Sequence, residues 1–183
     1  MRRFKNKRAL LPVLLVSILA GLSAKADPAP IKIAVFDFEF TDFSAGAGVA
    51  GDPADDLTQL NKATGEVRQL IKQSGRYDLV DTSGADKTAQ SLSQADGKAV
   101  QDRSLRDCNG CEAPIARQLG ADQSFLGVVS RISRMEYVVR LQIYDAHTGT
   151  LAFAAQSGLR MGANYSWYRG AADLIKSRLL NKS

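Results

Sequence analysis

The stretch Ile31–Phe40, which reads IKIAVFDFEF, constrains the fold more than any other part of the chain. From Ile33 to Phe36 the positions on both sides of an extended chain are apolar, as expected for a strand that is covered on both faces. We therefore predict one central strand over residues 31–40. Its carboxylates, Asp37 and Glu39, come at the end where the strand leaves the core.

The first 26 residues have the pattern of a secretory signal. Basic residues are concentrated in Arg2–Arg8, an apolar run follows over Ala9–Leu22, and Ala24-Lys25-Ala26 is an A-x-A cleavage site. The run contains Pro12 and lacks a stop-transfer flank, and no cysteine follows the cleavage site. We therefore expect a cleaved signal over residues 1–26, no stable membrane span afterwards, no lipid anchor, and a secreted or periplasmic domain over residues 27–183.

Cleavage changes the charge balance. The full sequence has a formal net charge of +5, but residues 1–26 hold six of its 24 basic residues and none of its 19 acidic ones. The processed chain is therefore close to neutral and slightly acidic. Nucleic-acid binding needs a basic surface that survives processing, so we expect no nucleic-acid partner. The remaining length suits one domain that buries about 70% of its extended-chain surface.

A helix is predicted after the first strand. Asp52 can cap it, Pro53 suits its first turn, and Gly75 can end it. Apolar residues recur at spacings of three and four along this stretch, which predicts one buried face. That face comprises Leu57, Leu60, Thr64, Val67 and Ile71. A short strand over 77–81 would complete a strand–helix–strand unit.

The second half of the chain predicts further strands and two helices. Residues 82–107 are polar and predict a loose surface segment with a helical turn or two. A short helix begins at Cys111 or Glu112 and ends at Gly120, and a last helix covers about Ser166–Leu180. Strands are expected over 122–133, 135–145 and 150–157. The fold class we predict is α/β (α+β), a single domain with a mixed sheet of about five strands and flanking helices.

Cys108 and Cys111 form the one sharp motif, and the chain has no other cysteine. We predict a structural disulfide between them, because an oxidising compartment favours pairing. A reactive dithiol remains an alternative, since a thiol at a helix start can have a lowered pKa. His147 is the single histidine, so zinc ligation lacks ligands, and haem attachment would need a histidine where Glu112 stands.

The carboxylates Asp37, Glu39 and Asp42 cluster at the end of the predicted central strand and just after it. Such a group can bind a cation or a small ligand, although solvated strand ends commonly carry acids as well. We keep Asp37 and Glu39 as a candidate ligand or cation site. No Ser/His/Asp set can be assembled around His147, which is expected in a polar turn. We therefore predict no catalytic residues, no metal and no cofactor.

Four segments together resemble a recurring pattern of uncharacterised secreted bacterial proteins, which are grouped as a domain of unknown function. The segments are IAVFDFEF, GRYDLVD, IARQLGADQSFLGVVSRI and LQIYDAHTGTLAF, and the resemblance covers about Ile31 to Leu180. The pattern is more distantly similar to the amino-terminal domain of the Tol-Pal translocation protein and to the soluble domain of the curli secretion channel. No β-propeller follows, unlike in the Tol protein. The resemblance implies a non-catalytic envelope domain that works through protein contacts.

Three functions follow from these observations. The first is a periplasmic accessory or assembly module that contacts an envelope protein through its sheet edge or the loop Thr41–Gly51. The second is a thiol–disulfide oxidoreductase with Cys108 as the nucleophile and Cys111 as the resolving thiol. The third is a small-ligand or cation-binding protein that uses Asp37 and Glu39.

Overall fold

The computed structural model describes residues 29–45, 53–85, 104–107 and 110–181. The centre of the fold is a mixed sheet whose main path runs β3-β1-β4-β5-β6. Strand β1 is parallel to both of its neighbours, β3 and β4, whereas β5 and β6 continue the sheet antiparallel. Two short strands lie off this path: β2 pairs with β4, and β7 pairs with β5. The strand bounds are β1 Ile31–Val35, β2 Glu39–Asp42, β3 Tyr77–Val80, β4 Gln123–Ser133, β5 Glu136–Asp145, β6 Leu151–Gln156 and β7 Arg160–Met161.

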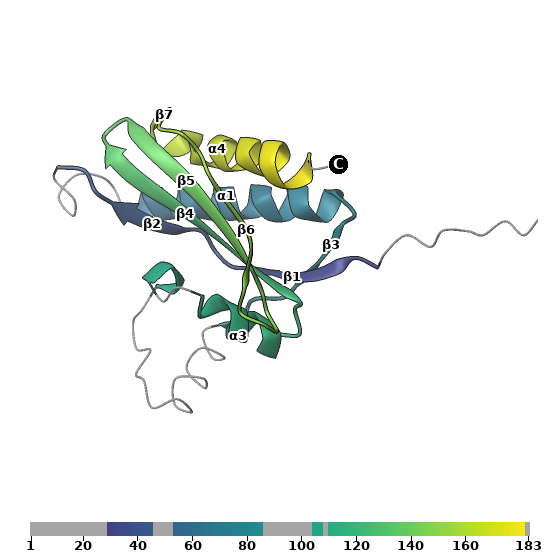
Figure 1. The fold of residues 1–183 in the computed structure, drawn as a ribbon. Coiled ribbons are helices and arrows are strands. Elements are labelled where there is room, and N and C mark those ends of the chain that lie inside the picture. Colours follow the sequence, from purple (N-terminus) through teal and green to yellow (C-terminus); the bar gives the residue numbers. More distant parts are fainter. Residues whose placement is uncertain (1–28, 46–52, 86–103, 108–109, 182–183) are drawn as a thin grey trace, which may run out of the picture.

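Helices cover both faces of this sheet (Figure 1). One face packs against α1 (Pro53–Gln73) and α4 (Trp167–Leu174), and α4 continues as the π-helical segment η3 (Ile175–Leu180). The short helix α3 (Glu112–Gln118) lies on the other face. Two single turns, η1 (Leu105–Asp107) and η2 (Asn164–Ser166), complete the described elements. The predicted single α/β (α+β) domain with a mixed sheet and flanking helices is confirmed.

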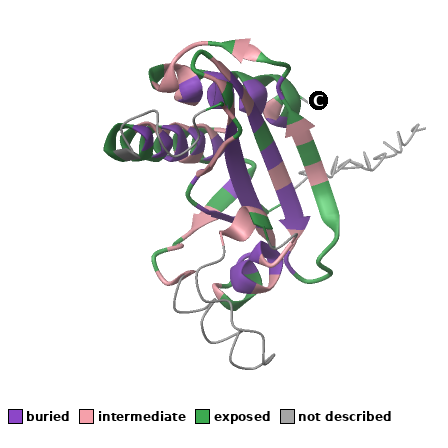
Figure 2. Cartoon of the chain, turned by 90° about the vertical axis from the view of Figure 1, so that its left-hand side faces the viewer, coloured by how far each residue is buried: buried purple, intermediate pink, exposed green. Residues whose placement is uncertain are grey.

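Strand β1 has both faces buried, as its sequence predicts. Ile33 and Val35 pack in the core cluster beneath α1 and α4, while Ala34 and Phe36 belong to the cluster beneath α3. None of these four residues is more than 3% exposed. The buried residues of the neighbouring strands run along the middle of the sheet (Figure 2). The side chains from Ile33 to Phe36 therefore point alternately to the two faces of the sheet, and both faces are covered by helices.

The predicted single strand over residues 31–40 is wrong in one respect, because it is interrupted. Strand β1 ends at Val35 opposite Phe125, and β2 begins at Glu39 opposite Val128, so this segment carries one residue more than the facing stretch of β4. The extra residue lets the backbone turn toward α1, where the Phe38 N–H donates to the buried Thr64 Oγ1 at 2.9 Å. The interruption places the Phe38 ring in the core.

Helix α1 agrees with its predicted bounds but not with its whole predicted face. Leu60, Thr64, Val67 and Ile71 are buried, whereas Leu57 is 58% exposed. In the first turn of the helix Asp56 points toward the sheet instead, because its carboxylate is paired with Arg131 of β4. Among the residues that the structure describes, no helix has the length and apolar character needed to cross a membrane.

Candidate functional site

Asp37 lies at a pocket beside the carboxyl ends of β1 and β3. The pocket has a volume of about 460 Å³, and its lining comprises Asp37, Arg68 and the segment Leu79–Ser83. Open α/β sheets commonly bind ligands beyond the carboxyl ends of parallel strands. The position of this pocket therefore agrees with the small-ligand hypothesis for Asp37.

Arg68 of α1 spans the pocket wall. Its Nη2 donates to the Val35 carbonyl oxygen at 2.7 Å and to Thr82 Oγ1 at 3.0 Å, and it lies 3.1 Å from Asp37 Oδ1. The Asp37 side chain is 73% exposed, so water screens this ion pair, which contributes at most about 1 kcal/mol. The guanidinium thus joins the ends of β1 and β3 and leaves the Asp37 carboxylate open to solvent.

Glu39 has different partners. Its Oε1 accepts the N–H of Leu105 at 2.7 Å and its Oε2 accepts the N–H of Arg106 at 2.9 Å. The Arg106 Nη1 also lies 3.6 Å from Glu39 Oε2. Glu39 therefore fastens the turn η1 to β2 by bonding two backbone N–H groups at its start.

The two predicted acids, Asp37 and Glu39, bind different parts of the protein. Asp37 pairs with Arg68 of α1, whereas Glu39 bonds η1. Within the described ranges, no three His, Cys, Asp or Glu side chains are grouped so as to hold a metal ion. The ligand or cation site at Asp37 and Glu39 stays a prediction, for which the pocket beside Asp37 is the supporting observation.

The cysteine pair lies at the start of α3. Cys111 directly precedes this helix, whose first residue is Glu112, as the sequence predicts. Cys108 lies outside the described residues. The disulfide between Cys108 and Cys111, and its redox alternative, therefore stay predictions.

Glu112 is a buried acid that the sequence does not single out. The residue is 1% exposed, and among the residues that the structure describes its Oε2 finds no hydrogen-bond partner. Burial raises the pKa of Glu112, and the charge of Glu39 acts in the same direction, although the N–H groups of Glu112 and Gly110 partly oppose them. The folded protein therefore keeps this carboxyl group protonated to a higher pH than the unfolded chain does.

This burial gives a pH-dependent prediction. Because the pKa of Glu112 is raised in the folded protein, the unfolded chain loses this proton first, and stability falls as the pH rises from about 4.5 through the folded pKa. Glu112→Gln should remove that fall, which amounts to at most about 1.4 kcal/mol per pH unit. Urea unfolding midpoints between about pH 4 and pH 8 measure it. Glu66→Gln on α1 is the control, and equal pH profiles for all three proteins would contradict the prediction.

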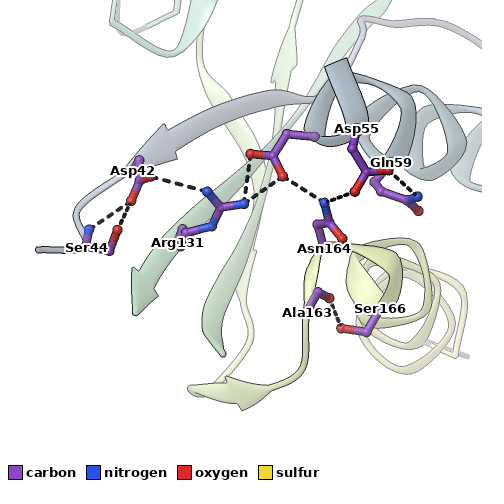
Figure 3. A network of polar contacts seen from close by, with 9 residues as sticks. Asp42, Ser44, Asp55, Gln59, Arg131, Ala163, Asn164 and Ser166 are labelled. Atoms are coloured by element: carbon purple, nitrogen blue, oxygen red, sulfur yellow. Dashed lines mark hydrogen bonds and ion pairs between the residues drawn. The ribbon is translucent and has the colours of Figure 1, made fainter. Parts of the chain in front are cut away.

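A charged network joins four elements at one end of the sheet (Figure 3). Arg131 Nη2 of β4 donates to both carboxylate oxygens of Asp56, at 2.6 and 2.8 Å, and its Nη1 donates to Asp42 at 3.3 Å. The Asn164 side chain of η2 donates to Asp56 at 2.9 Å and to Asp55 at 2.6 Å. One arginine and one asparagine thus hold the end of β2 and the start of α1 together.

Arg131 also packs against two stacked aromatic rings. Its guanidinium lies 4.8 Å from the centroid of the Phe40 ring and 5.4 Å from that of Trp167. Burial alone would raise the pKa of the Asp42 carboxyl, but the hydrogen bonds from Ser44 and the Arg131 charge outweigh it and lower that pKa below its ordinary value of 3.8. The network is therefore a partly buried set of paired charges that joins β2, β4 and α1.

Large apolar side chains are exposed around this support. The ends of β2, β4, β5 and β7 meet there (Figure 1), since the Phe43 N–H donates to the Arg131 carbonyl and the Gly162 N–H to the Met135 carbonyl. Met161 is 70% exposed and Phe43 is 67% exposed. We call the following set the apolar end: Phe43, Ile132, Met135, Met161 and Tyr165.

The sequence does not predict the apolar end. Ile132 and Met135 lie within the predicted strands over 122–133 and 135–145, and their positions there do not mark them as exposed. Arg131, the one charged residue of β4, is a signal for the charged network beneath it, because a charge within a sheet requires paired acids. Phe43 belongs to the loop Thr41–Gly51 that the sequence offers as a contact surface, but residues 46–51 lie outside the described part.

Several solved structures are similar to this chain at low identity. The C-terminal domain of LpoB from Salmonella enterica has 18% identity and a TM-score of 0.45, with 76% of this chain and 89% of that chain covered. Lipoprotein GNA1162 from Neisseria meningitidis has 10% identity and a TM-score of 0.48, with 82% and 99% covered. TolB from Acinetobacter baumannii has 17% identity and a TM-score of 0.37, with 82% of this chain and only 28% of TolB covered. The finer resemblance to the amino-terminal Tol domain and to the curli channel stays a prediction.

No curated protein matches the sequence of this chain. A family model matches residues 31–179, which include every described strand and helix except the last residue of η3. The predicted membership of an uncharacterised family is thereby confirmed. The chain belongs to the family DUF3280, whose description reads "Protein of unknown function (DUF2380)".

Proposed function

We propose that this protein is a non-catalytic accessory or assembly module of the bacterial cell envelope that acts by binding another protein. The apolar end is the observation that carries the proposal. Exposed apolar side chains that gather in one place commonly mark interaction surfaces, whereas single ones scattered over a surface do not. Here five of them lie on elements that meet at one end of the sheet.

The support beneath the apolar end suits a binding role. Asp42 and Arg131 form an ion pair at 3.3 Å. They directly precede Phe43 and Ile132 in the chain, so this pair fixes the backbone next to both apolar residues. Met161 of β7 is fixed by its pairing with Glu136 of β5. A surface whose backbone is already fixed loses less conformational freedom on binding, so more of the contact energy remains as affinity.

The compartment forms part of the same proposal. A secretory signal over residues 1–26 would deliver the domain to the periplasm or outside the cell, where an envelope protein is the partner that we propose. The processed chain is nearly neutral, so apolar contact rather than charge is the expected basis of its affinity.

A small-ligand function remains the second proposal, because of one observation. The pocket beside Asp37 and Arg68 lies where parallel strands end, which is a common ligand position. A thermal-shift screen with cations and small metabolites tests it, since a ligand at about 100 times its dissociation constant adds roughly 2.7 kcal/mol of stability. The shift should be lost in Asp37→Asn, and no shift with any compound would contradict this second proposal.

The protein-binding proposal predicts a specific loss of capture. The tagged full-length protein is cross-linked to its neighbours in the cells that produce it. It is then purified through the tag, and the cross-linked proteins are identified by mass spectrometry. The wild type should capture one dominant envelope protein. The double variant Phe43→Ser/Met161→Ser should capture at least tenfold less, because the two lost side chains together take away roughly 2–4 kcal/mol of apolar burial.

The control for this experiment is another exposed apolar residue. Ile31 is 39% exposed at the start of β1, and Ile31→Ser should capture as much partner as the wild type. Melting temperatures of the variants show whether each is folded. Equal capture by the folded double variant, or capture of no protein by the wild type, would contradict the proposal.

A further inference from the structure

The outer edge of β6 is a second surface that the proposed function does not use. Strand β6 ends the sheet path β3-β1-β4-β5-β6, and within the described part of the chain no strand pairs with its outer side. We propose that this edge binds β6 of a second copy of the chain, so that two sheets join antiparallel across a twofold axis.

The sequence of β6 lacks the charged residues and prolines that commonly protect an edge strand. Its six residues read LAFAAQ and contain no charged residue and no proline. Natural sheets commonly place lysine, proline or strong bulges at exposed edges, because unpaired backbone groups there can pair with another chain. The opposite edge strand, β3, is only four residues long and exposes Asp78. The two edges are therefore not equivalent, and β6 is the one suited to pairing.

The register of β6 shows which backbone groups are open. The Ser157 N–H donates to the Val139 carbonyl at 2.9 Å, so residues of this parity face β5. In an antiparallel ladder the alternate residues face away, which assigns outward N–H and C=O groups to Ala154 and Gln156. Strand β6 has one additional residue, Ala152, where Ile143 and Tyr144 pair with Phe153 and Leu151. The pairing from Phe153 to Gln156 is regular.

A twofold axis through Ala155 satisfies these open groups. It sets Ala154 of one copy opposite Gln156 of the other, and Gln156 opposite Ala154, so outward groups meet only outward groups. Every side chain in the paired segment is uncharged, so self-pairing brings no like charges opposite each other.

The side chains of β6 favour a second copy over a foreign peptide. A peptide that adds to a sheet edge gains its specificity from pockets for alternate side chains. Strand β6 has alanine at positions 152, 154 and 155, and such small side chains offer little to distinguish one foreign sequence from another. A twofold dimer instead makes each contact twice, which gives specificity through symmetry. It would also point the two apolar ends in opposite directions, so both remain available.

The test is the association state of the purified, processed protein by sedimentation equilibrium over a range of concentrations. The wild type should dimerise. Ala154→Lys and Ala154→Pro should each weaken the dimer by roughly tenfold or more, because one brings like charges together and the other removes an outward N–H. Ala154→Val should dimerise at least as tightly, since valine favours strands.

Further measurements separate this inference from the proposed function. The outward N–H of Ala154 is not bonded to β5, so a proline there should leave the monomer's melting temperature close to that of the wild type. Phe43→Ser/Met161→Ser should still dimerise, and Ala154→Lys should still capture the partner. A wild type that stays monomeric at every concentration, or a dimer unchanged in both the Lys and Pro variants, would overturn the inference. A dimer lost only in the Phe43→Ser/Met161→Ser variant would place self-association at the apolar end instead.

Discussion

Gly127→Ala is expected to lower the free energy of unfolding by about 3 kcal/mol, and the melting temperature by roughly 6–12 °C. A Cβ added at Gly127 in β4 would overlap the Phe38 ring, which lies directly on the glycine. That ring is 4% exposed, and its centroid lies 6.3 Å from that of Phe125. The ring cannot move aside without disturbing the core, so the clash destabilises the folded state. Urea unfolding measures the loss.

A second substitution tests whether the Phe38 ring is the cause. Phe38→Ala should itself cost about 3–5 kcal/mol, because it leaves a cavity. In that background Gly127→Ala should cost little, since the space above the glycine is then empty. Gly65→Ala is the matched control: Gly65 lies within α1 with no heavy atom within 4 Å of an added Cβ, and alanine there should stabilise by about 0.5–1 kcal/mol. Equal costs for Gly127→Ala in both backgrounds would contradict this packing model.

Arg131→Met is expected to cost about 3 kcal/mol, because it leaves the Asp42 and Asp56 carboxylates partly buried without their cation. The Arg131 and Asp56 side chains are only 13% and 10% exposed, so solvent does little to replace the lost pair. Arg134→Met is the control, because Arg134 lies exposed at the β4–β5 turn. Its change should stay within about 0.5 kcal/mol. Chemical denaturation near neutral pH compares the two variants.

Acidification gives this prediction a second readout. The pKa of Asp42 is lowered in the folded protein, so its contribution is present above the ordinary value of 3.8 and is lost as the pH falls through the folded pKa. Arg131→Met removes a cause of that lowering, so the variant should lose less stability than the wild type over this acid range. An Arg131→Met protein as stable as Arg134→Met at neutral pH, with an unchanged acid profile, would contradict the assigned role of the network.

The sequence predicts the centre of this fold well for a physical reason. Residues 33–36 are apolar at every position, and a strand between two helical layers buries both sides of such a segment, as it does here. The helix signals at Pro53 and Gly75 are local, since they depend on capping and backbone freedom, and they predict α1 closely. Periodicity and capping therefore suffice for the order of the elements.

The interruption at residues 36–38 has no such local signal. Phe36 and Phe38 continue the alternation of β1, and the extra residue is apparent only against the register of β4. Leu57 likewise fits the apolar spacing of α1, but the pairing of Asp56 with Arg131 decides which side of the helix faces inward. These features depend on contacts between distant parts of the chain, which periodicity does not encode.

The candidate site shows the same division. The sequence places Asp37 and Glu39 after the central strand, and the structure keeps them there but gives them separate partners in α1 and η1. The exposure of Met135 and Met161 depends on how the β4–β5 turn and β7 pack against the rest of the molecule, which the local sequence does not encode.

Site-specific photo-cross-linking in the producing cells tests the binding role of the apolar end most directly. A photoreactive residue is placed at Met161, which is 70% exposed, and separately at Lys72, an exposed residue in the last turn of α1. The account predicts a discrete adduct with one envelope protein from position 161 and none from position 72. Identical adducts at both positions, or none at position 161 in a folded and secreted protein, would contradict it.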